Sequence, residues 1–550
     1  MGKSRSSWAQ RSMASAMIAS AVLPFKADGG TAMASPSLAK AVRCTLSFKS
    51  SELTSSTAHS NGTRRAGGML RYITRRLRKD ASGEDVSARG SPQPCSHGRT
   101  NSSPIRPAFR TIRILLEKPV QSIRPMMRIV FATVGSLGDL FPFLAVGRVL
   151  AARGHRVTVA THPVHREAIE RAGLVFADAS GMPEPDDREA FTARAFHPWR
   201  GPAFVVRDFA AADVRASYAR LAPLCDEADV LVTSTLAFAG QILGETLEAA
   251  GRLRWLSAVL APASFLSAYD MPATGLAALD RFFRATPARG RLLQRLSRRV
   301  TRGWTAPVRA FRRELGLPPE SPRGDPFHRG QFAPGGTLAL FPALLGAPQP
   351  DWPPHTAQCG FARYVQPDGL DPALAEFLRA GPPPLVFSLG STAVHANASF
   401  LHESLAAAAA LGLRAVLFTG SPAMRERLPR DLPEGIVCVE YAPHAAVFPH
   451  AAAVVHHGGV GTSAEALHAG VPSLVVPHGF DQHDNAARLQ RLGVADVLPA
   501  TRYRGEAAAT RLGCLIDAAH RHRAEAVAGL LKGADGAASA ADVIEAAFDR

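Results

Sequence analysis

The chain has 550 residues, enough for two or three domains, and its 46% hydrophobic and 20% charged residues are ordinary for a soluble α/β protein. The formal net charge is +17, but residues 1–125 carry 21 Lys and Arg against 6 Asp and Glu. Residues 126–550 therefore have a net charge of only +2, which excludes a main body that binds nucleic acid or another polyanion over a broad surface.

The six cysteines are scattered, without a CxxC pair: Cys44, Cys95, Cys225, Cys359, Cys438 and Cys514. This spacing argues against a disulfide framework or a zinc site, so a reducing cytoplasm is expected. No uncharged apolar run approaches the roughly 18–20 residues that cross a bilayer. We therefore expect a cytoplasmic protein that is at most peripheral to the inner membrane.

The basic segment 1–125 is rich in Ser, Arg, Ala and Gly and has little sustained period of 2 or 3.6, so we expect it to be disordered. A targeting or nucleic-acid-binding tail is one interpretation, because its start is rich in Arg and Ser and poor in acids, like a transit peptide. The other is a wrongly assigned start, with translation beginning at Met126 or Met127. We favour the second, because the first predicted strand follows these methionines directly.

From residue 128 onwards, short apolar runs alternate with helical patterns. Strands are predicted at 128–133, 156–162, 174–179, 228–235, 254–262 and, as the last strand of this part, 337–344. A glycine-rich turn, VGSLGD, precedes the first helix, and helices are predicted at 141–155, 163–173 and 236–251. This alternation predicts a parallel sheet with right-handed crossovers.

A Pro-rich linker is predicted at 346–383, and the alternation then restarts. Strands are predicted at 384–391, 414–420, 436–443, 452–459 and 472–477, and helices at 399–412, 461–470 and 484–493. The sequence thus predicts two doubly wound domains, 127–345 and 384–530, that face a cleft where such folds bind ligands. The last segment, 531–550, is predicted to end in a helix (541–550) that packs back across the first domain.

Residues 454–467, VVHHGGVGTSAEAL, predict a cradle for phosphate. A strand delivers His456 and His457 to a turn that opens a helix, and the turn contains Gly458, Gly459 and Gly461. Glycines let backbone N–H groups approach an anion, and the helix N-terminus adds roughly half a positive charge. The pattern is neither a P-loop nor GxGxxG. Thr462 lies in the first helical turn, and Glu465, one turn on, is within reach of a ribose hydroxyl pair.

A second polar pair follows about twenty residues later. Asp481 and Gln482 stand after a strand, at the start of a helix. A carboxylate beside an amide suits the vicinal hydroxyls of a sugar.

Residues 456–493, HHGGVGTSAEALHAGVPSLVVPHGFDQHDNAARLQRLG, resemble the nucleotide-sugar signature of the UDP-glycosyltransferase superfamily, whose fold is GT-B. A broader resemblance covers roughly residues 127–525. It implies that His457 contacts the diphosphate with Gly461 and Thr462 in support. It also implies that Glu465 binds the ribose, and that Asp481 and Gln482 bind the donor sugar.

Two shorter matches lie nearby. YAPH (441–444) resembles the aromatic-Ala-Pro-Gln element of the family, with His444 in place of the Gln. This match implies that Tyr441 lies near the base. FSLGS (387–391) resembles the end of a family strand and implies that Ser391 lies near the phosphates.

In the first domain, GSLGDLFPFLA (135–145) resembles the GxxGHxxPxxxLA turn of the family, with Asp139 where many members have a catalytic His. Sterol and glycopeptide-antibiotic glycosyltransferases and the rhamnosyltransferase of rhamnolipid synthesis resemble this Asp version. Softer matches to the rhamnolipid enzyme are 340–353 and 311–317. An Asp with an ordinary pKa near 3.9 is a weak base, so it would need partial desolvation. The alternative is that Asp139 caps the helix that follows.

The resemblance implies an inverting transfer of a hexose from a nucleoside-diphosphate sugar (UDP- or dTDP-linked) to a hydroxyl of a hydrophobic acceptor, with no cofactor. No DxD element ends a strand of the second domain, so no metal is implied. The specific expectation is rhamnosyl transfer from dTDP-rhamnose to a 3-hydroxyacyl lipid. The alternatives are a UDP-glucosyltransferase of sterols, polyketides or flavonoids, a nucleotide-sugar epimerase, and a non-catalytic nucleotide-sugar-binding partner subunit. An epimerase needs carboxylates from both domains, and a partner subunit would be expected to lose Asp139 or the Asp481–Gln482 pair.

Other chemistry-bearing residues have weaker patterns. His155, His162 and His165 flank early strand ends and are not expected to touch substrate. Residues 281–313 contain eleven Arg and no acid, which predicts either a helical flap that meets an anionic lipid or the inner leaflet, or a solvated helix face. The aromatic residues nearby line an apolar acceptor pocket or a core: Phe265, Phe282, Phe283 and Trp304.

Overall fold

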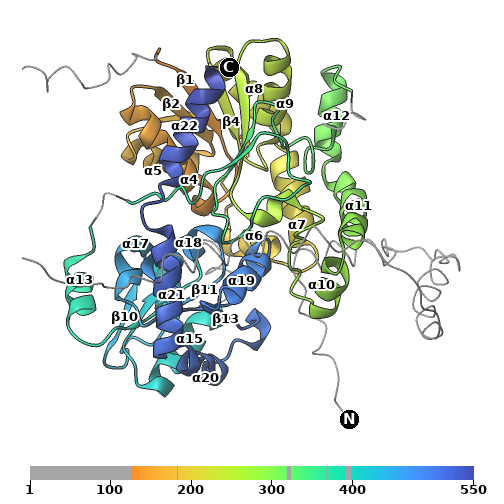
Figure 1. Cartoon of the computed structure of the whole chain (residues 1–550). Helices are drawn as coiled ribbons and strands as arrows, with labels where there is room; N and C mark the ends of the chain where they lie inside the picture. The colour runs from red at the N-terminus through yellow and green to blue at the C-terminus, as the bar shows by residue number, and fades with distance from the viewer. Residues whose placement is uncertain (1–124, 183, 319–323, 367–368, 391–397, 550) are drawn as a thin grey trace, which may run out of the picture. The chain divides into compact units, whose positions relative to one another are not determined.

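The computed structural model describes residues 125–549 except 183, 319–323, 367–368 and 391–397 (Figure 1). The basic segment up to residue 124 and the predicted phosphate-site residue Ser391 lie outside the described residues.

The first sheet has seven parallel strands in the order β3-β2-β1-β4-β5-β6-β7. The strands are β1 (Arg128–Ala132), β2 (Arg156–Thr161), β3 (Val175–Asp178), β4 (Val230–Thr233), β5 (Arg254–Val259), β6 (Thr337–Ala339) and β7 (Thr356–Gln358). The predicted last strand is therefore only the sixth, and part of the predicted linker is strand. TAQ (356–358) is too short for a period of 2 to show, and its partner β6 makes it a strand.

The helices of this first half are α4 (Leu137–Ala152), α5 (Arg166–Arg171), α6 (Arg188–Ala195), α7 (Gly201–Ala203), α8 (Val214–Asp226), α9 (Phe238–Ala249), α10 (Ala277–Arg284), α11 (Pro287–Trp304) and α12 (Ala306–Glu314). Short 3₁₀ turns cover Pro163–His165 and Pro262–Phe265, and a π-helix covers Phe204–Ala211. Helix α4 starts four residues earlier than predicted because Ser136 caps it.

The second sheet has six parallel strands in the order β10-β9-β8-β11-β12-β13. They are β8 (Leu385–Ser388), β9 (Ala415–Phe418), β10 (Ile436–Val439), β11 (Ala453–His456), β12 (Ser473–Val475) and β13 (Ala495–Val497). The helices of this second half are α13 (Pro372–Arg379), α15 (Ala398–Leu411), α16 (Pro422–Glu426), α17 (His444–Val447), α18 (Val460–Ala469), α19 (Gln482–Arg491), α20 (Gly505–Leu515) and α21 (Ala518–Leu531). Single 3₁₀ turns cover Phe448–His450 and Ala500–Arg502.

Both sheets change direction of winding at one place, next to their first strand. In the first half this is between β1 and β4, and in the second half it is between β8 and β11. Ligands of open α/β sheets bind beyond the carboxyl ends of the strands at such a switch point. The turns after β1 and β11, which carry the two main motifs, stand there.

The last helix, α22 (Gly536–Phe548), packs against α4 and shares its apolar core (Figure 1). Glu545 accepts from Arg153 and pairs with His155 at 3.0 Å each. The C-terminal helix thus lies on the first half, and its ion pair with His155 accounts for His155 as a structural residue.

Candidate active site

The carboxylate of Asp139 is held at the N-terminus of α4. The N–H and O–H of Ser136 donate to Asp139 Oδ2 at 2.8 and 3.1 Å, and Ser136 is the N-cap residue of the helix. Gly135 has φ +143°, and a Cβ on it would lie 2.2 Å from Oδ2, so only glycine lets the carboxylate lie there. The N-cap residue is therefore Ser136, and Asp139 takes part in the helix cap as the N3 residue of a capping box.

The environment of Asp139 also suits a base. Burial raises the pKa of its carboxyl, against the opposing effects of the Ser136 hydrogen bonds and of His165 nearby. Both Ser136 hydrogen bonds end on Oδ2, and among the described residues no other side chain donates to Oδ1. A carboxylate with a raised pKa and an oxygen to spare can take a proton from a hydroxyl.

An apolar cavity of about 240 Å³ opens beside this turn in the first half. Its wall includes the ends of β1 and β2, the π-helix and the starts of α8 and α9; its larger side chains are Val134, Met182, Phe191, Phe209, Leu221 and Phe238. None of these side chains was predicted from the sequence to line a pocket. Of the four aromatic residues predicted to line a pocket or a core, Phe265, Phe283 and Trp304 are core residues, at most 9% exposed, and none of the four lines this cavity.

Two histidines stand in the cavity wall. His162 and His165 both line it. His165 Nε2 lies 3.0 Å from the carbonyl oxygen of Gly135, so Nε2 carries the hydrogen. Burial lowers the pKa of His165, which keeps the ring neutral beside Asp139.

The glycine-rich turn of the second half shapes the surroundings of His457. Gly458 has φ +87°, and Gly459 is the N-cap residue of α18. A Cβ on Gly459 would lie 2.4 Å from His457 Nε2, and one on Gly390 2.7 Å from Cε1, so the imidazole packs between two glycines. A Cβ on Gly461 would have nothing within 4 Å.

His457 and His456 are both buried but differ in their hydrogen bonds. Burial, reinforced by neighbouring histidines, lowers the pKa of His457 well below its usual value, and its Nδ1 is buried without a hydrogen-bond partner among the described residues. His456 is fully buried; its Nδ1 accepts from Gly458 N–H at 3.1 Å, and its Nε2, too, has no hydrogen-bond partner among the described residues. Thr462 is 8% exposed in the first turn of α18.

Asp481 and Gln482 stand at the start of α19, as predicted. Burial raises the pKa of Asp481 to about 6, and the charge of Asp139 adds to that rise. Gln482 Oε1 accepts from the N–H groups of His478 and Gly479 at 2.8 and 3.1 Å. Its carbonyl thus fixes the turn, which leaves the NH₂ group as the part suited to a ligand.

A residue that sequence reasoning missed joins the two motifs of the second half. Asn485 Nδ2 donates to the carbonyl of Gly458 at 2.9 Å and to Asp481 Oδ2 at 2.8 Å. The signal was its position one helical turn after Asp481, on the same face.

The remaining predicted residues lie around α18. Glu465 forms an ion pair with Arg363. The Tyr441 hydroxyl donates to Gln366, and the Tyr441 side chain is 54% exposed, so its ring is accessible for stacking. His444 lies 3.0 Å from the Ser388 hydroxyl and stacks on Phe448.

In the part of the chain that the structure describes, no group of His, Cys, Asp and Glu has the arrangement of a metal site. No helix there is both long and apolar enough to cross a membrane.

Two family models match the chain. The Glycosyltransferase family 28 N-terminal domain matches residues 129–252, in the first half. The Erythromycin biosynthesis protein CIII-like, C-terminal domain matches residues 404–538, which begin in the second half and end at the start of α22.

Similar proteins span most of the described chain. The O-mycaminosyltylonolide 6-deoxyallosyltransferase of Streptomyces fradiae is 33% identical over 386 residues, which are 67% of this chain and 85% of that protein. The glycosyltransferase VinC, solved in complex with dTDP, has a TM-score of 0.52 and 20% identity over 77% of this chain and all of its own. The spinosyn rhamnosyltransferase SpnG has a TM-score of 0.52 and 21% identity over 76% of this chain and 99% of its own. At these identities, the two structures bear on the fold alone.

Proposed function

The chain belongs to the glycosyltransferases of the GT-B fold, and from this premise we propose an inverting, metal-independent transfer of a hexose to a hydroxyl of a hydrophobic acceptor. The observation that carries the proposal is the partly desolvated carboxylate of Asp139, which lies against Gly135 in the wall of an apolar cavity of about 240 Å³. A cavity of this kind suits a hydrophobic molecule, and the carboxylate suits its hydroxyl.

The reaction is a single displacement at the anomeric carbon. Asp139 takes the acceptor proton while the acceptor oxygen bonds to the anomeric carbon. The bond from that carbon to the diphosphate oxygen breaks, and the nucleoside diphosphate leaves with the electron pair. His457, neutral because of burial, and the N–H groups at the start of α18 receive the charge of the leaving group.

The donor is held by the second half. We assign the base to Tyr441, the ribose hydroxyls to Glu465 and the sugar hydroxyls to Asp481 and Gln482. Asp481 accepts from Asn485 through Oδ2 only, and the amide group of Gln482 adds a donor. A carboxylate and an amide at the start of one helix match two neighbouring hydroxyls.

For the substrates, we propose rhamnosyl transfer from dTDP-rhamnose to a 3-hydroxyacyl lipid. The resemblance of residues 340–353 and 311–317 to the rhamnolipid enzyme favours this donor, and the apolar cavity favours a lipid chain. The alternatives remain a UDP-glucosyltransferase of sterols, polyketides or flavonoids, and a nucleotide-sugar-binding partner subunit.

We also propose peripheral contact with the inner membrane through α11. One face of this helix is buried through Gly290, Leu293, Ser297, Thr301 and Trp304, and the opposite face exposes Arg291, Arg295, Arg299 and Arg302. Leu292 and Phe282 beside this stripe are each 42% exposed. Exposed apolar side chains among arginines suit a bilayer with anionic lipids.

The experiment is nucleoside diphosphate release from dTDP-rhamnose, dTDP-glucose and UDP-glucose, each with a 3-hydroxyacyl lipid, with a sterol or with neither. Lipid-dependent release from dTDP-rhamnose is the expected result. Release from a UDP-sugar with the sterol would move the substrates to the first alternative, and binding without release would favour the partner subunit. Asp139→Asn should keep nucleotide binding and lower turnover about 100-fold or more; near-native turnover would refute Asp139 as the base.

A further inference from the structure

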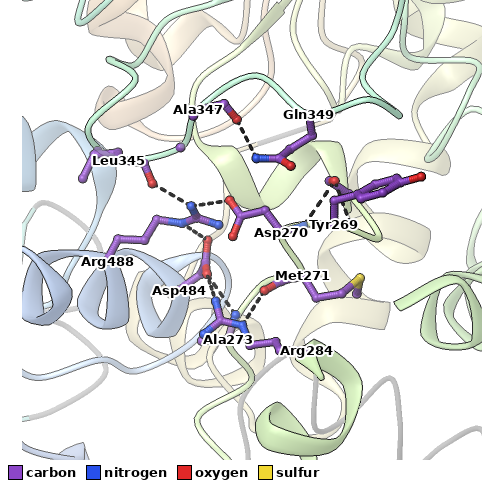
Figure 2. A network of polar contacts seen from close by, with 12 residues as sticks. Tyr269, Asp270, Met271, Ala273, Arg284, Leu345, Ala347, Gln349, Asp484 and Arg488 are labelled. Carbon is purple, nitrogen blue, oxygen red and sulfur yellow. Dashed lines mark hydrogen bonds and ion pairs between the residues drawn. The ribbon is translucent and has the colours of Figure 1, made fainter. Parts of the chain in front are cut away.

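A buried guanidinium joins the donor-sugar helix to the first half. The Arg488 side chain in α19 is 1% exposed; its Nε donates to Asp484 Oδ2, and its Nη1 donates to Asp270 Oδ2 and to the carbonyl of Leu345, all at 2.6 Å (Figure 2). Asp484 is one turn earlier on the same helix. Asp270 and Leu345 lie in the first half, after β5 and β6.

The other oxygen of Asp484 is bound to the first half as well. Its Oδ1 accepts from Ala273 N–H at 2.9 Å and from Arg284 Nη2 at 3.4 Å, while Arg284 Nε donates to the carbonyl of Met271 at 2.7 Å (Figure 2). Three segments of the first half, around residues 270–273, 284 and 345, therefore converge on one face of α19.

A gain in the stability of the fold does not by itself account for such a cluster. Its two arginines and two aspartates balance in charge, but desolvating buried ions cancels much of their attraction, and well-packed apolar residues often stabilise as much. What buried charges supply more reliably is a fixed geometry, because each N–H and each carboxylate oxygen accepts few arrangements.

The same face of α19 carries the donor-sugar carboxylate. Asp481, Asp484 and Arg488 are spaced i, i+3 and i+7, which places them along one side of the helix. At the N-terminal end of α19, the Asn485 side chain donates to both Asp481 and the carbonyl of Gly458. A shift of α19 against the first half would therefore move Asp481 relative to Asp139.

We propose that Arg488, Asp484 and Asp270 are positioning residues that set the place of the donor sugar relative to the acceptor half. This rests on the proposed function for the identity of the donor. None of the three touches the nucleotide site around His457, so their loss should disturb transfer more than nucleotide binding.

The test uses Asp270→Asn in the full chain, because Asp270 is the most exposed of the three and its loss leaves the Arg488–Asp484 pair intact. We expect the Kd for dTDP and UDP to stay within about twofold and kcat for transfer to fall about 10- to 100-fold, as for a misplacement of about 1 Å. Asp270→Glu should restore part of kcat. Arg488→Met should act in the same direction, with a lower melting temperature.

The matched control is Glu189→Gln. Glu189 and Arg427 also link the two halves, at 2.7 Å, but their side chains are 55% and 39% exposed. We expect this variant to keep native kcat and Kd. An Asp270→Asn protein that binds nucleotide weakly while its kcat is unchanged would assign the network a merely structural role and overturn the proposal.

Hydrogen exchange gives a readout that needs no substrate. Asp270→Asn should speed exchange of the His478 and Gly479 amides, which Gln482 holds, and Glu189→Gln should not. If the wild-type protein shows no turnover, the proposed function fails, and this measurement still decides whether the network fixes the start of α19. Unchanged exchange would refute that role.

Discussion

Arg363 holds the carboxylate of Glu465 through two parallel hydrogen bonds, with Nε 3.0 Å from Oε1 and Nη2 2.6 Å from Oε2. Arg363 lies between β7 and α13, and Glu465 lies in α18. Each carboxylate oxygen has a further lone pair, so ribose hydroxyls can donate to a carboxylate whose orientation is already fixed.

The first prediction follows from this pair. Arg363→Met should weaken binding of dTDP and UDP about fivefold, because Glu465 then has to be immobilised when the nucleotide binds. Isothermal titration calorimetry measures the Kd for each nucleotide. Arg379→Met, which removes the exposed pair with Glu376, should leave the Kd unchanged. Tighter binding in Arg363→Met would mean that Arg363 competes with the ribose.

The second prediction concerns pH. The pKa of Asp481 is raised to about 6 in the folded protein, from an ordinary value of 3.8. If the ionised carboxylate binds the sugar, KM for the donor should rise as pH falls below about 6. Initial rates between pH 5 and 8 measure this, and Asp481→Asn should have a high KM that no longer changes with pH in this range.

The same carboxylate predicts a stability effect of definite sign. Between pH 3.8 and about 6 the folded protein binds more protons at Asp481 than the unfolded chain does, so its contribution to stability falls as pH rises through this window. Asp481→Asn should therefore raise the melting temperature at pH 7.5 by roughly 2–4 °C for each kcal/mol recovered. The gain should be smaller at pH 4.5. Calorimetry measures the gain in melting temperature at both pH values. An equal gain at pH 7.5 and pH 4.5 would contradict the raised pKa of Asp481.

The third prediction concerns the cavity. Ala179 lines it, so Ala179→Phe should fill part of it and lower kcat/KM for the acceptor about 10-fold or more, with nucleotide binding unchanged. Ala249→Phe, at an exposed position near the end of α9, is the control. Native acceptor kinetics in Ala179→Phe would place the acceptor elsewhere.

The fourth prediction concerns the arginine face of α11. Arg295→Glu with Arg299→Glu should lower partition onto phosphatidylcholine vesicles that contain phosphatidylglycerol about 30-fold or more, since each Arg near an anionic surface contributes about 1 kcal/mol. Arg430→Glu with Arg502→Glu makes the same change of net charge at exposed positions of the second half. Equal loss of vesicle binding in both double variants, or no vesicle binding by the wild type, would mean that the arginine face of α11 is only solvated.

The sequence predicted those features that depend on residues close together in the chain. Strands such as β4 and β11 are buried along their whole length, so they appear as continuous apolar runs, and the turn between β11 and α18 is marked by its glycines. The positions of His457 and Asp481 follow from local motifs of this kind.

Other features depend on partners that are distant in the sequence. Arg488 stands in a helix full of polar residues, which predicts exposure, yet it is buried by partners 143 and 218 residues away. The cavity wall comes partly from the π-helix, whose Phe209 has no local signal that separates a cavity-lining side chain from a core one. The burial of Arg488 and the wall of the cavity could therefore be found only from the tertiary structure.

The packing of α22 on α4 has a consequence for the order of synthesis. Ala540, Ala541 and Ile544 complete the core of the first half, yet the ribosome makes them after the whole second half. At about 5–20 residues per second, the roughly 190 residues between β7 and the end of α22 take about 10–40 s. During that time α22 does not yet cover the apolar side of α4, the helix that holds Asp139. A nascent chain should therefore complete the core of its first half only after the second half has been synthesised.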